Sequence, residues 1–125
     1  MSSPLILVVE DNETNQMLTL AVLQRDGYRV MVAGSAEEAR HRLKEGTPDL
    51  ILMDVQLPGE DGLAFTRELR AKASTRSIPI VAMTAHAMEG DAQQAIDAGC
   101  TGYISKPIDT RALGEQVRKH LAVAP

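Results

Sequence analysis

The sequence predicts one α/β domain in which helices cover both faces of a five-stranded parallel sheet, a doubly wound (βα)5 architecture. Short apolar, β-branched runs alternate five times with segments of helical periodicity along the 125 residues. Strands that are joined through helices pair in parallel. Runs such as residues 5–9 and 50–53 contain no apolar–polar alternation, as expected for strands that are covered on both faces.

The five predicted strands are short apolar runs of about four to six residues, a length typical of buried strands. They are Leu5–Val9, Arg29–Ala33, Leu50–Met53, Ile80–Met83 and Gly102–Ser105. No linker, repeat or low-complexity tract interrupts them, so residues 1–125 are expected to form a single domain.

The first two predicted helices each have a stop signal. The first ends at Gly27, and the second ends at Gly46. The second begins with a capping box, in which Ser35 bonds the backbone of Glu38 and the Glu38 side chain reaches back. The apolar residues expected to face inward are Met17, Leu20, Ala21 and Leu23 in the first helix and Ala36, Ala39 and Leu43 in the second.

Three further helices are predicted in the second half of the chain. One covers residues 63–73 and is capped by Asp61, and the next ends at Gly99. The last is capped by Asp109. The inward residues are expected to be Ala92, Ala95 and Ile96 in the fourth helix and Leu113, Val117 and Leu121 in the fifth.

Composition excludes several classes of function. A formal net charge of -4 argues against direct nucleic-acid binding, which needs clustered cations, and three aromatic residues are too few for base stacking. The lone cysteine, Cys100, is expected to be a small packed thiol and fits a reducing compartment. The chain shows neither a signal peptide nor an apolar run long enough for a membrane span. A cytoplasmic location is therefore expected.

Polar side chains follow four of the predicted strands, and ligands of such sheets bind beyond the carboxyl ends of the strands. These side chains are Glu10, Asp11, Asn12, Asp54, Thr84 and Lys106. Taken singly, all but one of them have an ordinary explanation. Asp11 or Asn12 can cap a helix, Glu10 can be solvated, and a strand-end threonine can bond the backbone. Asp54 is the exception, because Asp61 is the better cap for the helix that follows it.

Taken together, these residues indicate phosphoryl transfer. The carboxylates of Glu10, Asp11 and Asp54 would repel one another at one edge unless a cation neutralised them, and an all-oxygen cluster suits Mg²⁺. Thr84 and Lys106 can contact phosphate oxygens as a hydroxyl donor and a point charge. A carboxylate can also act as the nucleophile, and Asp54 is the candidate because its strand is expected to be central.

Four motifs resemble those of receiver domains from bacterial two-component response regulators, in the same order and spacing. They are LILVVEDN (5–12), DLILMDVQLPGEDG (49–62), IVAMTA (80–85) and GYISKPI (102–108). The resemblance spans essentially the whole chain and implies a flavodoxin-like receiver topology. The chain is most similar to single-domain regulators of the cell-cycle type and to receivers of hybrid kinases, which share its Glu-Asp-Asn opening and its Ala-Gly-Cys stretch (98–100).

The resemblance implies a role for each matching residue. Asp54 would take a phosphoryl group from a histidine kinase or a histidine phosphotransfer protein. Mg²⁺ or Mn²⁺ would be held by Asp11, Asp54 and the backbone carbonyl of Gln56, with Glu10 acting through water. No organic cofactor is expected, and the chain would be a signalling phosphoacceptor rather than an enzyme that turns over a separate substrate.

The resemblance also implies how the phosphorylation would be read. Thr84 and Lys106 would contact the phosphate, and Thr84 would move with Tyr103 as a switch that remodels the face of helix four, strand five and helix five. The bond between Lys106 and Pro107 is expected to be cis. Gln56 and His86 occupy the positions that tune the lifetime of the phosphate, although a partly exposed loop histidine is the simpler interpretation of the latter.

Three alternatives stay open on the sequence. An aspartate-nucleophile phosphatase would need a second aspartate two residues after the nucleophile, where this chain has Gln56. A flavodoxin-like cofactor binder would need a Ser, Thr or Gly phosphate loop after the first strand, where this chain has Glu-Asp-Asn. The third is a receiver cut from a hybrid histidine kinase; the initiating methionine and short tail favour a free-standing protein. The downstream partner is not identified by the sequence.

Overall fold

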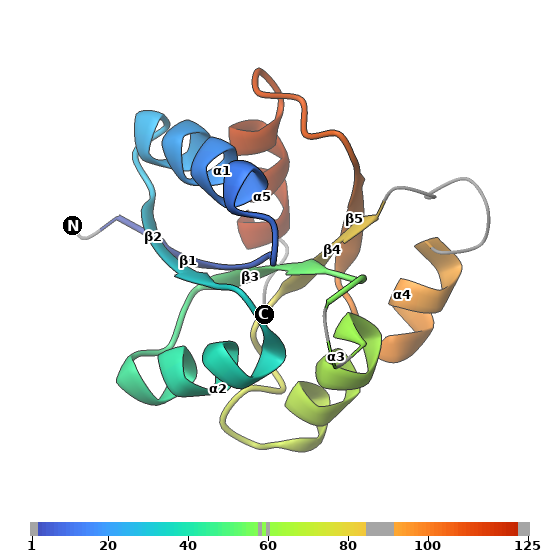
Figure 1. Cartoon of the computed structure of the whole chain (residues 1–125). Coiled ribbons are helices and arrows are strands. Elements are labelled where there is room, and N and C mark those ends of the chain that lie inside the picture. Colours follow the sequence, from blue (N-terminus) through green and yellow to red (C-terminus); the bar gives the residue numbers. More distant parts are fainter. Residues whose placement is uncertain (1–2, 58, 60, 85–91, 123–125) are drawn as a thin grey trace.

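The computed structural model describes residues 3–57, 59, 61–84 and 92–122, in which strands and helices alternate as predicted (Figure 1). The elements are β1 (Leu5–Val9), α1 (Glu13–Arg25), β2 (Arg29–Ala33), α2 (Ala36–Glu45), β3 (Leu50–Asp54), α3 (Gly62–Ala71), β4 (Ile80–Thr84), α4 (Ala92–Ala98), β5 (Gly102–Ser105) and α5 (Leu113–Ala122). All five strands are parallel and lie in the order β2-β1-β3-β4-β5, so the prediction of the fold class is confirmed.

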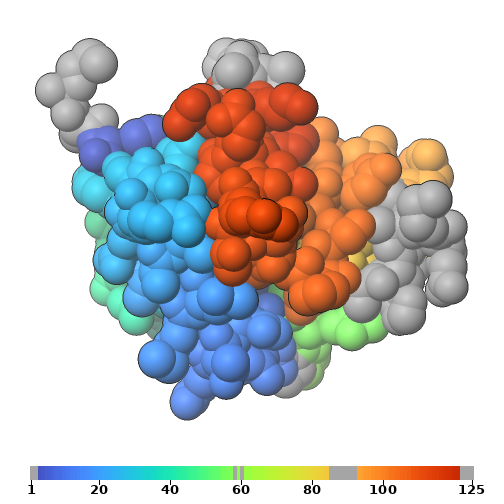
Figure 2. Space-filling view, turned by 90° about the horizontal axis from the view of Figure 1, so that it is seen from above, coloured from blue at the N-terminus to red at the C-terminus, as the bar shows by residue number. Residues whose placement is uncertain are grey.

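The helices form one layer on each side of the sheet. Helices α1 and α5 cover one face, where they lie side by side, and α2, α3 and α4 cover the other (Figures 1 and 2). Alternate residues of each central strand enter different cores. Ile6 and Val8 pack beneath α1 and α5, whereas Leu7 and Val9 pack toward α2 and α3. This division explains why the central strands are apolar at every position before their carboxyl ends, where β3 ends at Asp54 and β4 at Thr84.

Helix α1 begins as predicted but buries a different face. Asn12 is its N-cap, and the side chain of Asn12 accepts a hydrogen bond from the backbone N–H of Asn15. The prediction of the inward face was wrong at two positions, since Met17 is 70% exposed and Ala21 is also exposed. The buried residues of the helix are Thr19, Val22 and Leu23. Apolar periodicity here is weak, so packing against the sheet and α5 decides which side turns inward.

Helices α2 and α3 each begin after a residue whose side chain caps the first turn. Asp61 caps α3 as predicted and accepts a hydrogen bond from the N–H of Leu63. Ser35 accepts from the N–H of Glu38, the first half of the predicted capping box. The returning bond differs from the prediction, because the Glu38 carboxylate accepts from the N–H of Gly34, one residue before the cap. The amide of Glu38, in the first turn of the helix, is satisfied by Ser35 in either arrangement.

One prediction for the later helices needs correction. Asp109 acts as a cap as predicted, since its side chain accepts a hydrogen bond from the N–H of Arg111 and its carbonyl accepts one from the N–H of Leu113, where the regular part of α5 starts. In α4, Ala95 is buried but Ile96 is 43% exposed. The α5 stripe is confirmed, with Leu113 and Val117 buried and Leu121 partly buried. Within the described residues, no helix combines the length and apolar character that crossing a bilayer requires.

Candidate functional site

The site lies where the chain changes direction across the sheet. From β1 the chain continues to the neighbouring edge strand β2, and from β3 it continues the other way to β4 and β5. The crevice outside the carboxyl ends of β1 and β3 is therefore the topological switch point, where parallel sheets bind ligands. Glu10 follows β1 directly, and Asp54 is the last residue of β3.

Three carboxylates meet at this crevice. One carboxylate oxygen from each of Glu10, Asp11 and Asp54 lies within 4.8 Å of the other two. Asp11 is exposed, whereas Glu10 and Asp54 are 1% and 2% exposed. The single-residue interpretation of Glu10 as a solvated side chain was therefore wrong. It follows β1, which lies between two paired strands, and its side chain is covered rather than free in water.

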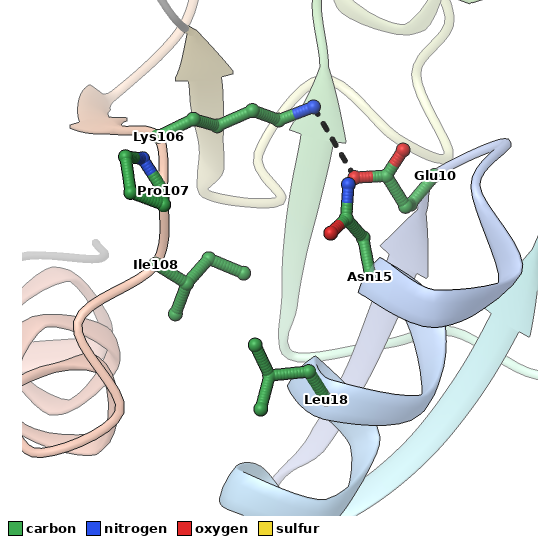
Figure 3. Close-up of a pocket in the computed structure, with 6 residues that line it drawn as sticks. All are labelled: Glu10, Asn15, Leu18, Lys106, Pro107 and Ile108. Carbon is green, nitrogen blue, oxygen red and sulfur yellow. Dashed lines mark ion pairs between the residues drawn. The ribbon is translucent and has the colours of Figure 1, made fainter.

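Lys106 places a positive charge beside these carboxylates. It follows β5, which lies on the other side of β4 from β3. Its Nζ lies 2.9 Å from Oδ2 of Asp54 and 3.2 Å from Oε1 of Glu10, and the second ion pair is drawn in Figure 3. Burial by itself would lower the pKa of this ammonium group. The hydrogen bond to Asp54 and the charges of Asp54 and Glu10 outweigh burial, so the pKa of Lys106 is raised above its ordinary value.

The buried carboxylates also accept backbone hydrogen bonds. The N–H of Gln56 donates to Oδ1 of Asp54 over 3.0 Å, and the N–H of Asn12 donates to Oε2 of Glu10 over 3.2 Å. Burial nevertheless raises the pKa of Glu10, and the adjoining Asp54 carboxyl raises it further. The crevice therefore concentrates negative charge beyond what one lysine neutralises, and a divalent cation would relieve this repulsion.

Thr84 and Tyr103 lie on neighbouring strands near this crevice. Thr84 ends β4 and is 1% exposed, and it pairs in register with Ser105 of β5. Tyr103, two residues earlier on β5, is 45% exposed, so its ring is largely outside the core. The peptide bond between Lys106 and Pro107 is cis. His86 lies outside the described residues.

A cavity of about 290 Å³ opens beside the carboxylates (Figure 3). Glu10 and Lys106 form its polar end. Leu18 of α1 and Ile108, after the cis proline, provide apolar surface away from the carboxylates. Neither Leu18 nor Ile108 was predictable as a cavity residue, because an apolar residue in a helix or loop gives the same local signal whether it faces a core or a cavity.

The donor set indicates what the crevice can do. Carboxylate oxygens are the ligands that Mg²⁺ prefers, so Glu10, Asp11 and Asp54 fit a hard divalent cation. A lysine within hydrogen-bonding distance of Asp54 can also pair with an anion placed on that residue. These features suit a phosphoryl group held on or near a carboxylate, in which positioning and charge neutralisation provide most of the catalysis.

Comparison with known proteins decides the family. Residues 6–118 match the family of response regulator receiver domains. The chain belongs to the receiver domain family. It is 40% identical over 119 residues to the polar-differentiation response regulator DivK of Brucella ovis, which covers 95% of this chain and 97% of DivK. This receiver is thus a phosphoacceptor of a signalling pathway rather than an enzyme with a separate substrate, which sets aside the phosphatase and flavodoxin alternatives.

Solved receiver structures show the same fold. The receiver domain of the sensor histidine kinase PA1611 from Pseudomonas aeruginosa PAO1, described with a magnesium ion coordinated in its active-site cleft, is 36% identical with a TM-score of 0.87, over 97% of this chain and 99% of that one. The receiver domain of a signal transduction histidine kinase from Syntrophus aciditrophicus is 30% identical with a TM-score of 0.86, over 96% and 91% of the two chains.

Proposed function

We propose that Asp54 accepts a phosphoryl group from a phosphohistidine of a histidine kinase or a histidine phosphotransfer protein. The observation that carries the proposal is the buried Asp54 carboxylate, held 2.9 Å from Lys106 and within 4.8 Å of two further carboxylates. An Asp54 oxygen attacks phosphorus, the phosphorus–nitrogen bond of the donor breaks, and the imidazole leaves with that electron pair. The product is an acyl phosphate on Asp54.

The proposed metal is Mg²⁺, with Mn²⁺ as a substitute. Asp11, Asp54 and the backbone carbonyl of Gln56 would hold it, and Glu10 would act through a water molecule. The all-oxygen donor set supports this assignment, and so does the magnesium ion in the cleft of the PA1611 receiver. When bound, the metal supplies positive charge that stabilises the phosphoryl oxygens.

The remaining site residues would hold the phosphate in place and change conformation when it is present. Lys106 would pair with one phosphate oxygen, and the Thr84 hydroxyl would donate to another. Movement of Thr84 would leave room for Tyr103, now 45% exposed, to turn inward and reshape the face of α4, β5 and α5 for a downstream protein. Gln56 and His86 would set the rate at which water reaches the acyl phosphate. The downstream partner is a protein, and neither nucleic acid nor a membrane is bound directly.

The phosphodonor protein would rest on the apolar side of the cavity in Figure 3. Leu18 is 40% exposed and Met17 is 70% exposed on α1, and the cavity that Leu18 lines also contains Lys106 and Glu10. A donor seated there would hold its phosphohistidine close to Asp54. Leu18→Ser should therefore slow transfer from a phosphotransfer protein and leave phosphorylation by acetyl phosphate unchanged. If Leu18→Ser and the parent chain accept phosphate from the protein donor at equal rates, the donor does not rest on this side of the cavity.

We also propose that residues 1–125 are a single receiver domain that acts in the cytoplasm. The extent of the match to DivK, 97% of that protein, supports a single-domain regulator. A receiver belonging to a hybrid kinase is the second candidate, which the two kinase receivers described above favour. A phosphotransfer profile against the histidine kinases and phosphotransfer proteins of the source organism would identify the donor.

The decisive experiment is phosphorylation of an Asp54→Asn variant with acetyl phosphate and Mg²⁺, followed by intact mass. The parent chain should gain one phosphoryl group that is lost on alkaline treatment, and the variant should gain none. Asp97→Asn, which changes an exposed aspartate of α4, is the matched control and should be labelled like the parent. Stoichiometric labelling of Asp54→Asn would disprove the assignment of the phosphoacceptor.

A further inference from the structure

A second cavity, of about 300 Å³, lies between α2, α3 and the segment that joins α3 to β4. Strands β3 and β4 begin on this side of the sheet, whereas Asp54 and Thr84 lie at their opposite ends. The cavity is therefore separate from the phosphorylation site. Its lining residues are Arg40, Leu43, Lys44, Thr47, Leu69, Lys72, Ser74, Thr75 and Ile78.

One side of the cavity is apolar and held in place. Leu69 and Ile78 are 1% and 6% exposed and belong to the core beneath α2 and α3, against which Leu43 also packs. Arg70 fixes the joining segment by donating to the carbonyl of Ile78 over 2.6 Å and to a second carbonyl in the same segment. The Thr75 hydroxyl adds a bond to the carbonyl of Leu69. A preformed apolar surface binds a ligand with little ordering cost.

The other side of the cavity is cationic. Arg40, Lys44 and Lys72 line it, and none of its lining residues is acidic. Glu68, just outside, pairs with Arg40 over 2.7 Å and with Lys72 over 3.4 Å, so one carboxylate is shared between two of the three cations. Among the described residues, no carboxylate pairs with Lys44. The cavity is therefore positively charged although the chain as a whole has a net charge of -4.

Hydroxyl groups complete the polar side. Thr47 and Ser74 are exposed and lie at the cavity, where each can donate to an anion. Lys44 and Lys72 stand at the ends of α2 and α3, where cations also stabilise the helix dipole. Stabilising the helix dipole would explain the two lysines, but it would not explain the cavity or its apolar surface. The combination of apolar surface, cations and hydroxyls is the composition of a small-molecule site.

We propose that this cavity binds a small amphipathic anion, in which an apolar body rests on Leu43, Leu69 and Ile78 and one carboxylate or phosphate head contacts Lys44 and Lys72. The volume is at the lower end of the range for ligand sites, so the ligand is small. The arginine remains paired with Glu68 and forms a wall of the site, because it is held by two hydrogen bonds to that carboxylate and stacks over Phe65.

The test is titration of the full-length chain with phenyl phosphate in the absence of divalent cations, followed by backbone amide NMR. Saturable shifts are expected at Thr47, Ser74 and Thr75. Inorganic phosphate should bind roughly tenfold more weakly at these residues, because it lacks the apolar body. Absence of saturable shifts there, or equal affinity for inorganic phosphate, would overturn the proposal.

Variants locate the binding. Lys44→Gln and Lys72→Gln should each weaken phenyl phosphate binding by roughly two- to fivefold, the range for an exposed ion pair. Lys119→Gln, which removes an exposed lysine from α5, should bind like the parent chain. Asp54→Asn should also bind like the parent, which separates this cavity from the phosphorylation site. Unchanged affinity in both cavity variants, or loss of binding in Asp54→Asn, would refute the site.

Discussion

The ammonium nitrogen of Lys106 lies 2.9 Å from a carboxylate oxygen of Asp54, although 52 positions separate the two residues in the sequence. The pair spans the carboxyl edge of the sheet from β3 to the segment after β5, with β4 between them. The contact also brings Lys106 to Glu10. One cation thus holds together two buried carboxylates that would otherwise repel each other.

Lys106→Met should destabilise the chain in the absence of divalent cations. It leaves Glu10 and Asp54 buried without their cation, and we expect the free energy of unfolding to fall by about 1–3 kcal/mol. Excess Mg²⁺ should stabilise the variant more than the parent, because a bound cation replaces the lost charge. Urea unfolding with and without Mg²⁺ measures both effects. Lys119→Gln is the control, and an equal response of variant and parent to Mg²⁺ would contradict the expectation.

Gly62→Ala should disturb the site through the backbone of Asp54. A Cβ at Gly62 would overlap the carbonyl oxygen of Asp54 and lie 3.0 Å from Cα of Val55, and both obstacles are backbone atoms. We expect a loss of about 1–3 kcal/mol in the free energy of unfolding and slower labelling by acetyl phosphate. Gly46→Ala is the matched control, because a Cβ there meets no atom within 4 Å. Equal stability of the two variants would show that the close approach at Gly62 is relieved without cost.

Cys100 should be unreactive until the chain opens. Cys100 is 6% exposed, and burial raises the pKa of its thiol, so little thiolate is available at pH 8. We expect a thiol-specific disulfide reagent to react with the native chain on the order of 100-fold more slowly than with the chain unfolded in urea. The colour released by the reagent gives both rates. Comparable rates would mean that the thiol is accessible in the native state.

His120 should make stability fall in mild acid. Burial lowers the pKa of its imidazole, with a smaller contribution from Lys119. The unfolded chain then binds a proton at a higher pH than the folded chain does, so this residue's contribution to stability is lost as the pH falls through the ordinary histidine value toward the lowered one. NMR titration of the His120 ring should give a midpoint below about 6.5. His120→Gln should reduce the loss of stability between pH 7 and pH 5, and an unchanged pH profile would assign that loss to other groups.

The alternation of strands and helices was predictable because hydrophobic periodicity and capping are local properties. Apolar runs identified all five strands, and the structure extends two of them by one residue, to Asp54 and Thr84. The face of α1 was not predictable, since Thr19 is buried and Met17 is exposed. A helix with apolar residues on several sides has no unique inward face until it packs against the sheet and α5.

The site also has features that local sequence patterns predict and features that depend on tertiary packing. The sequence by itself determined which residues end the strands and that carboxylates gather at one edge, because parallel strands bring their carboxyl ends together. Only the tertiary structure decided that Glu10 is buried, that Lys106 reaches it, and that Leu43, Lys44, Leu69 and Lys72 enclose a second cavity at the opposite edge. The burial of a side chain and its distance from another residue depend on how elements far apart in the chain pack together. Local sequence patterns do not specify that packing.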